Sequence, residues 1–209
     1  MQLDRNQIED LERKFKLNLI NSVSGIKPAN LIGTISTDGK ENVAIFSSII
    51  HIGSSPAQLG FILRPQEEIP RDTYLNIQTA GYYTINHVNS AFLEKAHYTS
   101  AKLDRGDSEF ERMKIESEYI SKFPAPFVRE SHIKIGMKHS ESISISNGCT
   151  LVIGTVELIS IPENTINELG QIDLEKSFSM GVSGLNTYYD LVKRDSFPYV
   201  RTSEIPSFE

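Results

Sequence analysis

Short apolar runs with a strand-like pattern recur along much of the chain and are separated by turn residues. They lie at 29–36, 43–52, 58–64, 81–88, 133–138 and 150–161. Runs of this length that are rich in Ile, Val and aromatic residues are typical of β-strands. The links at 37–40 and 53–56 are too short for a crossover helix. The pattern therefore predicts an antiparallel sheet that forms a closed or split barrel.

The run at 43–52 is expected to form one strand with apolar side chains on both faces. Such strands are covered on both sides, here by the barrel interior and by a helix or a second subunit. Ser47 and Ser48 stand in the middle of the run. Because successive side chains point to opposite faces, only one of these hydroxyls can point at a given ligand. Their hydrogen-bond partner is either a polar ligand edge or the neighbouring backbone.

Helical periodicity is confined to shorter segments. Residues 5–20 repeat apolar residues at helical spacing and predict an amphipathic N-terminal helix. Shorter helices with polar N-terminal caps are expected at three further places: 73–79 after Asp72, a segment after Asn89 or Ser90, and 108–114. The tail after 162 is expected to hold at most one or two short helices. These elements predict a single domain over 1–209, mainly β with peripheral helices.

The charge balance narrows the classes of partner. The chain carries 21 basic and 27 acidic residues, a net charge of −6, whereas general binders of nucleic acid or anionic membranes need a basic surface. The single cysteine, Cys149, excludes an intramolecular disulfide, and the 5 histidines lack metal-ligand spacing, so no metal site is expected. Apolar runs are shorter than the roughly 18 residues of a membrane helix, and the polar first residues do not resemble a signal peptide. A cytoplasmic location is expected.

One corner of the predicted fold has the groups that a phosphate needs. Arg64 ends a strand, Arg71 stands at a helix start, and the Thr73 hydroxyl lies beside the free N–H groups of that helix. The alternative is an ordinary helix start with two solvated arginines. Glu67 and Glu68 between them favour this alternative, because carboxylates repel a phosphate dianion.

A second loop adds a weaker candidate. Ser100 with Lys102 either contacts a phosphate or ribityl group or belongs to a plain solvated loop. No Gly-x-Gly-x-x-Gly motif follows a predicted strand, so a dinucleotide fold of the Rossmann type is not indicated.

Several short blocks occur in an order and spacing that match a known family over residues 27–160. They are Lys27-Pro28, 31–34, 42–44, Phe46-Ser47-Ser48, Ser55-Pro56, Arg71-Asp72-Thr73, Asn76-Ile77, 84–88, Thr99-Ser100, Ser108-Glu109-Phe110, Pro126, Glu130-Ser131 and 151–155. This order resembles the flavin reductase and flavoredoxin family of FMN-binding split β-barrels, which are antiparallel and Greek-key-like.

The resemblance implies a homodimer with one FMN per subunit near the interface. It implies NADH or NADPH as hydride donor, and a monooxygenase partner, free flavin or another redox protein as acceptor. No catalytic acid–base pair is expected, because hydride transfer from nicotinamide to flavin depends on stacking geometry. The residues carried over to the flavin are Ser47 and Ser48 along the isoalloxazine edge, Arg71 and Thr73 at the phosphate, Ser100 as a further contact, and Thr34 and Asn42 on strands nearby.

The leading interpretation is thus an NAD(P)H-dependent FMN reductase. Two features differ from the family pattern: the loop at 65–70 is longer and more acidic, and Lys27 stands where Arg is common. One alternative is a flavin-binding electron carrier without a nicotinamide pocket. Another is a structural split-barrel module whose acidic loop has abolished flavin binding.

Overall fold

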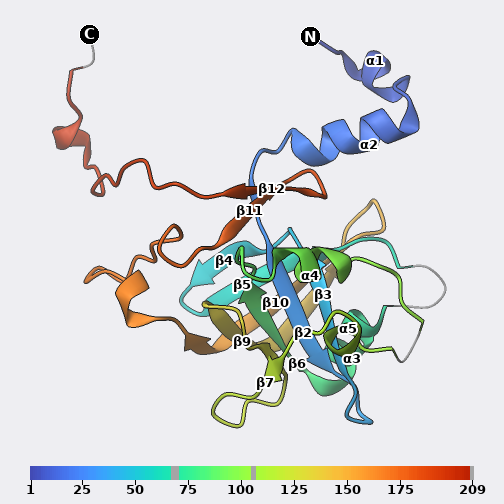
Figure 1. The fold of residues 1–209 in the computed structure, drawn as a ribbon. Coiled ribbons are helices and arrows are strands. Elements are labelled where there is room, and N and C mark those ends of the chain that lie inside the picture. Colours follow the sequence, from blue (N-terminus) through green and yellow to red (C-terminus); the bar gives the residue numbers. More distant parts are fainter. Residues whose placement is uncertain (67–70, 105–106, 208–209) are drawn as a thin grey trace.

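The computed structural model in Figure 1 is built on an antiparallel sheet and describes residues 1–66, 71–104 and 107–207. Its main sheet has seven strands in the order β3-β2-β6-β9-β10-β5-β4. They are β2 (Asn30–Ile35), β3 (Glu41–Phe46), β4 (Ile50–Ser54), β5 (Ala57–Leu63), β6 (Tyr82–His87), β9 (Lys134–Ser144) and β10 (Thr150–Ser160). The expected antiparallel strands and the hairpin turn after β2 are confirmed.

The sheet curls without closing, which confirms the split barrel. β3 and β4 follow each other in the chain but stand at opposite edges of the sheet. The prediction of one continuous strand over 43–52 is therefore wrong, since β3 ends at Phe46 and β4 begins at Ile50. The cause is local: the Ser48 hydroxyl donates to the Ile62 carbonyl and accepts from the Ile62 N–H, both at 3.1 Å. A side chain thus replaces the main chain where β4 would continue its ladder with β5.

Two apolar clusters lie on the two faces of the sheet. The barrel interior holds Phe61 and Tyr83, both fully buried, with their ring centroids 5.7 Å apart. Ile77 of α3 (Asp72–Ala80) packs into this cluster. On the outer face, α4 (Leu93–Tyr98) and α5 (Glu109–Arg112) contribute Ala96 and Phe110 to a cluster that covers β2 and β3. β2 and β3 are therefore largely buried on both sides, as the apolar runs predict, whereas β4 is mostly exposed, so the expected cover on both faces is absent there.

Two helix starts differ from expectation. Arg71, and not Asp72, is the N-cap of α3; its backbone is extended and its side chain makes no capping hydrogen bond. α4 begins after Phe92, because the Asn89 side chain instead accepts from the Ala91 N–H in a preceding turn. The short helix expected near 108–114 is present as α5.

The predicted N-terminal helix is broken into α1 (Arg5–Glu9) and α2 (Arg13–Ser22). Asp4 caps the first helix, and the Glu12 carboxylate accepts from the N–H groups of Lys14 and Phe15, which starts the second. Neither helix has a buried residue, and both stand away from the barrel in Figure 1.

The prediction that the tail holds only short helices is wrong. β11 (Met180–Ser183) and β12 (Thr187–Asp190) form a hairpin, and β11 also pairs with β1 (Lys27–Pro28). Lys27 fixes this arrangement, because its Nζ donates to the carbonyls of Asn21 and Gly184 at 2.9 and 2.8 Å. Two 3-10 helices, η1 (Glu163–Thr165) and η2 (Thr202–Glu204), complete the tail.

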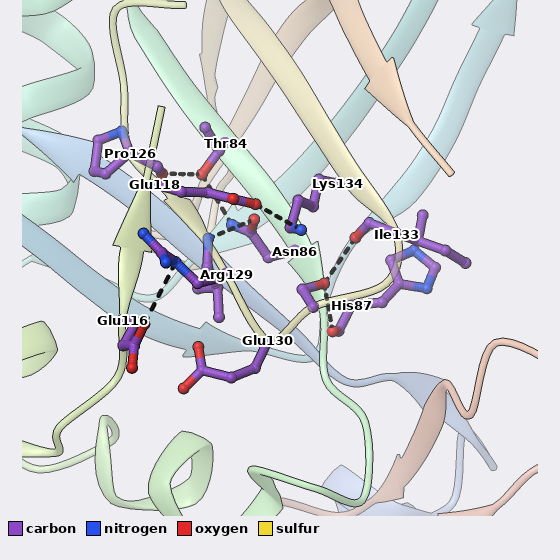
Figure 2. Close-up of polar contacts among 12 residues, drawn as sticks. Thr84, Asn86, His87, Glu116, Glu118, Pro126, Arg129, Glu130, Ile133 and Lys134 are labelled. Atoms are coloured by element: carbon purple, nitrogen blue, oxygen red, sulfur yellow. Dashed lines mark hydrogen bonds and ion pairs between the residues drawn. The ribbon is translucent and has the colours of Figure 1, made fainter. Parts of the chain in front are cut away.

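A third layer is the segment with β7 (Ser117–Glu118) and β8 (Phe127–Val128), which packs on β6. Figure 2 shows one of the contacts, in which Thr84 donates to the Pro126 carbonyl at 2.6 Å. The Asn86 side chain also accepts from the Val128 N–H at 3.0 Å. Gly33 permits this approach, since a Cβ there would lie 2.3 Å from the Pro126 oxygen. No helix in the described ranges is both long and apolar enough to cross a membrane.

Candidate functional site

The break between β3 and β4 leaves a short stretch of main chain outside both ladders. Residues 47–49 have no strand partner, and their main-chain groups make no hydrogen bond to another described residue. The Ser48 hydroxyl is held by Ile62, so the neighbouring-backbone alternative holds for this residue. The Ser47 side chain is half-buried and finds no hydrogen-bond partner among the described residues. The break therefore offers main-chain donors and acceptors and one hydroxyl to a polar ligand edge.

Asn30 adds an unpaired amide beside this break. It is 1% exposed, and neither its Oδ1 nor its Nδ2 has a partner within the described residues. It lies opposite Phe46 in the β2–β3 register, one residue before the break, and on the same face of β2 as the interior residue Ile32. A buried amide without partners is costly, so a ligand edge with alternating donors and acceptors fits this position. The sequence reasoning did not select Asn30, although a polar residue in an apolar run was the available signal.

Two cations stand at the same end of the barrel. Arg64 directly follows β5 and is exposed, two residues after the Ile62 partner of Ser48. Burial lowers the pKa of Lys27, and the nearby positive charge of Arg64 lowers it further. Arg64 is thus near the break, and it is also linked to the start of α3, because the Gln66 side chain donates to the Arg64 carbonyl at 2.8 Å and accepts from the Arg71 N–H at 2.9 Å.

Three other predicted residues, Thr34, Asn42 and Thr73, lie together near position 34 of β2, four residues after Asn30. Thr34 and Asn42 are register partners and both are buried. Thr34 accepts from the Asn76 side chain at 3.0 Å, and the Asn42 amide contacts the Thr73 hydroxyl at 3.1 Å. Four strand residues at about 3.3 Å each separate this polar network from Asn30 by about 13 Å. The separation suits an elongated ligand with polar groups at both ends.

Arg71 and the first turn of α3 border this network. Arg71 is exposed and forms no ion pair with a described residue, and the N–H groups of Asp72 and Thr73 have no acceptor there. The Thr73 side chain is 4% exposed and is turned toward Asn42. A cavity of about 360 Å³ lies beside them, lined in part by Asn42, Asp72 and Asp107. The corner thus combines free donors and one guanidinium with nearby carboxylates.

A buried carboxylate also reaches this corner. Glu109 is 9% exposed, and its Oε2 accepts from the Val43 N–H at 3.3 Å on the free edge of β3. Burial raises the pKa of Glu109, and the charges of Asp72 and Asp107 raise it further, although the Val43 hydrogen bond acts against them. Sequence reasoning placed Glu109 in a family block but gave it no role.

The remaining loop residues are less closely tied to the site. Ser100 is exposed in the turn after α4, where its N–H donates to the His97 carbonyl at 3.1 Å. No hydrogen bond joins Ser100 to Arg71 or Thr73 within the described residues. Glu67 and Glu68, the acidic residues of the loop at 65–70 that differs from the family pattern, lie outside the described residues.

Comparisons with known proteins identify the family and the fold of the chain. A family model described as "Flavin reductase like domain" matches residues 26–174. A split-barrel protein of Shewanella frigidimarina NCIMB 400, provisionally named a flavin reductase, is 42% identical, with a TM-score of 0.92 over 96% of this chain and 100% of that one. Nitrilotriacetate monooxygenase component B of Bacillus cereus is 19% identical, with a TM-score of 0.81 over 94% and 98% of the two chains. The 2-nitrobenzoate 2-nitroreductase of Pseudomonas fluorescens is 20% identical, with a TM-score of 0.81 over 99% of both chains.

Proposed function

The chain belongs to the flavin reductase like family, and from this premise we propose that it binds FMN and transfers hydride to it from NADH or NADPH. The observation that carries the proposal is the open main chain at 47–49 beside the Asn30 amide, which has no hydrogen-bond partner within the described residues. This is the kind of edge that a flavin pyrimidine ring, with its alternating acceptors and donor, can satisfy. A bound FMN would supply the hydride-accepting ring.

The residues then have distinct roles in binding. Ser47 and the main chain at 47–49 would orient the ring edge, and Ser48 would hold the break open through Ile62. Arg71 and the free N–H groups at the start of α3 would meet the phosphate, as cationic groups and helix N-termini do. Arg64 would add positive charge at the ring end. The protein contributes geometry and hydrogen bonds, so no catalytic acid or base is required.

A homodimer and an electron acceptor complete the proposal. Apolar side chains remain exposed on α2 and β4, including Phe15 at 48%, Ile20 at 48% and Ile50 at 43%, which supports a self-association surface. The Bacillus cereus structure is named as a component of a monooxygenase, which supports a monooxygenase or another redox protein as acceptor. A cytoplasmic location and a single domain over 1–209 are part of the same proposal.

The test is the visible spectrum of the purified protein with added flavin, followed by NADH and NADPH. We expect FMN to bind and its absorbance to bleach anaerobically with at least one nicotinamide, at catalytic rates when free flavin or oxygen is present. FMN and FAD are compared to fix the cofactor, because the isoalloxazine ring is common to both. Bound FMN without nicotinamide oxidation would indicate the electron-carrier alternative. Absence of binding by both flavins would refute the proposal.

A further inference from the structure

The Asn42 amide lies between two buried groups from different helices, the Glu109 carboxyl and the Thr73 hydroxyl. One of its terminal atoms lies 3.0 Å from Glu109 Oε2, and the other lies 3.1 Å from Thr73 Oγ1. Asn42 belongs to β3, Glu109 to α5 and Thr73 to α3, and all three are at most 9% exposed. The amide therefore connects a titratable group to the start of the helix that borders the candidate phosphate corner.

The hydrogen bonds that join Glu109, Asn42 and Thr73 can be arranged in two ways. When Glu109 is ionised, the amide nitrogen donates to it, and the amide oxygen then accepts from the Thr73 hydroxyl and from the Val43 N–H, which lies 3.2 Å away. When Glu109 is protonated, it donates to the amide oxygen, and the amide nitrogen donates to Thr73 Oγ1. The Val43 N–H then loses the amide oxygen as an acceptor and keeps only Glu109 Oε2, at 3.3 Å. The Thr73 hydrogen is engaged in the first arrangement and free in the second.

The surroundings of Glu109 favour its protonated form. Besides its burial, Glu109 faces the charges of Asp72 from α3 and Asp107 from its own loop, and both raise its pKa. The β2–β3 hairpin adds three charged groups to the adjoining cavity, Asp38, Lys40 and Glu41. Lys40 is the one cation among the described residues that line this cavity. A carboxylate in this environment is poorly compensated, and a phosphate dianion nearby would disfavour it further.

We propose that Glu109, acting through the Asn42 amide, controls whether Thr73 can donate a hydrogen bond to the flavin phosphate at the start of α3. Glu109 and Asn42 are positioning residues in this scheme, and the proposal rests on the proposed function. Protonation of Glu109 frees the Thr73 hydrogen and removes a negative charge. FMN affinity therefore decreases as pH rises through the titration of Glu109, whereas riboflavin, which lacks the phosphate, does not follow this change.

The experiment measures dissociation constants for FMN and riboflavin from pH 5.5 to 8.5 in the full-length protein and in Glu109→Gln. The amide keeps the shape of the side chain and mimics its neutral form. We expect the ratio of FMN to riboflavin affinity to fall about tenfold more in the wild type than in the variant, the effect of one charge-assisted hydrogen bond. The phosphate of FMN titrates in the same range, but this contribution is common to both proteins and cancels in the comparison.

Thr73 gives an independent test if Glu109→Gln folds poorly. Thr73→Ser keeps the hydroxyl and should keep the pH dependence of FMN affinity. Thr73→Val should bind FMN about tenfold more weakly at low pH, and its FMN affinity should no longer depend on the protonation of Glu109. Parallel profiles for the wild type and Glu109→Gln, or equal profiles for the two Thr73 variants, would overturn the inference and leave the proposed function standing. Absence of binding by both flavins in the wild type would instead overturn the proposed function and this inference with it.

Discussion

The Ser48 hydroxyl takes the place of a main-chain pair at the break between β3 and β4, and removing it should lower the stability of the protein by a predictable amount. The hydroxyl makes two hydrogen bonds to Ile62, one as donor and one as acceptor, both at 3.1 Å and half-buried. A net hydrogen bond contributes about 1 kcal/mol, so Ser48→Ala should lower the free energy of unfolding by about 2 kcal/mol. For a chain of 209 residues this corresponds to a fall in Tm of roughly 4–8 °C.

The assay is urea or thermal unfolding followed by far-UV circular dichroism, because the chain has no tryptophan. Ser47→Ala is the matched control: its side chain has no partner within the described residues, so its stability should change by less than about 0.5 kcal/mol. Ser48→Thr keeps a hydroxyl and should recover part of the loss.

A Ser48→Ala protein as stable as the wild type would show that the two bonds are not needed to hold the break. Equal losses for Ser47→Ala and Ser48→Ala would refute the division of roles between the two serines. FMN affinity distinguishes the two variants in the opposite sense to stability, since Ser47→Ala should weaken FMN binding while the barrel stays as stable as in the wild type.

Three further outcomes follow from single contacts. Arg71→Ala should weaken FMN binding by about 1.5–3 kcal/mol without affecting riboflavin; equal loss for both ligands would remove Arg71 from the phosphate corner. Burial lowers the pKa of His87 to about 4 from its ordinary 6.5, so stability present above pH 6.5 should be lost as pH falls through 4. His87→Gln should flatten that dependence in unfolding titrations. Gly33→Ala should destabilise by about 3 kcal/mol, because its Cβ would meet the Pro126 carbonyl, whereas Gly53→Ala, with 3.5 Å to its nearest atom, should change the Tm little.

The strands were predictable because they bury alternate or successive apolar side chains, but the break at 47–49 was not. Hydrophobic periodicity reports which side chains leave water, and it does not report whether the main chain is paired. Residues 47–49 remain half-buried, as do the last residues of β3, so neither burial nor apolar character marks where that strand ends. The signal that distinguishes them is the Ser48 hydroxyl, whose partner Ile62 is 14 residues away.

The same limit applies to the C-terminal hairpin and to the direction of Thr73. β11 is stabilised by pairing with β1, where Val182 lies opposite Lys27, a contact that no local pattern contains. Thr73 was correctly placed at a helix start, but its hydroxyl turns toward Asn42, 31 residues earlier in the chain. Local propensity therefore located the element, and a distant polar partner determined where its side chain points.

The length of the candidate site is determined by one strand that looks ordinary in the sequence. Asn30, Ile32 and Thr34 share the interior face of β2, so two polar side chains are separated by one apolar residue of the core. Asn30 lies opposite Phe46, one residue before the break, and Thr34 joins the network beside α3. Because β3 pairs with β2 through an unbroken register at these positions, the two ends keep a fixed separation. A polar-apolar-polar pattern on one strand face, opposite a break in its neighbour, is thus the feature that relates this sequence to the shape of its proposed ligand.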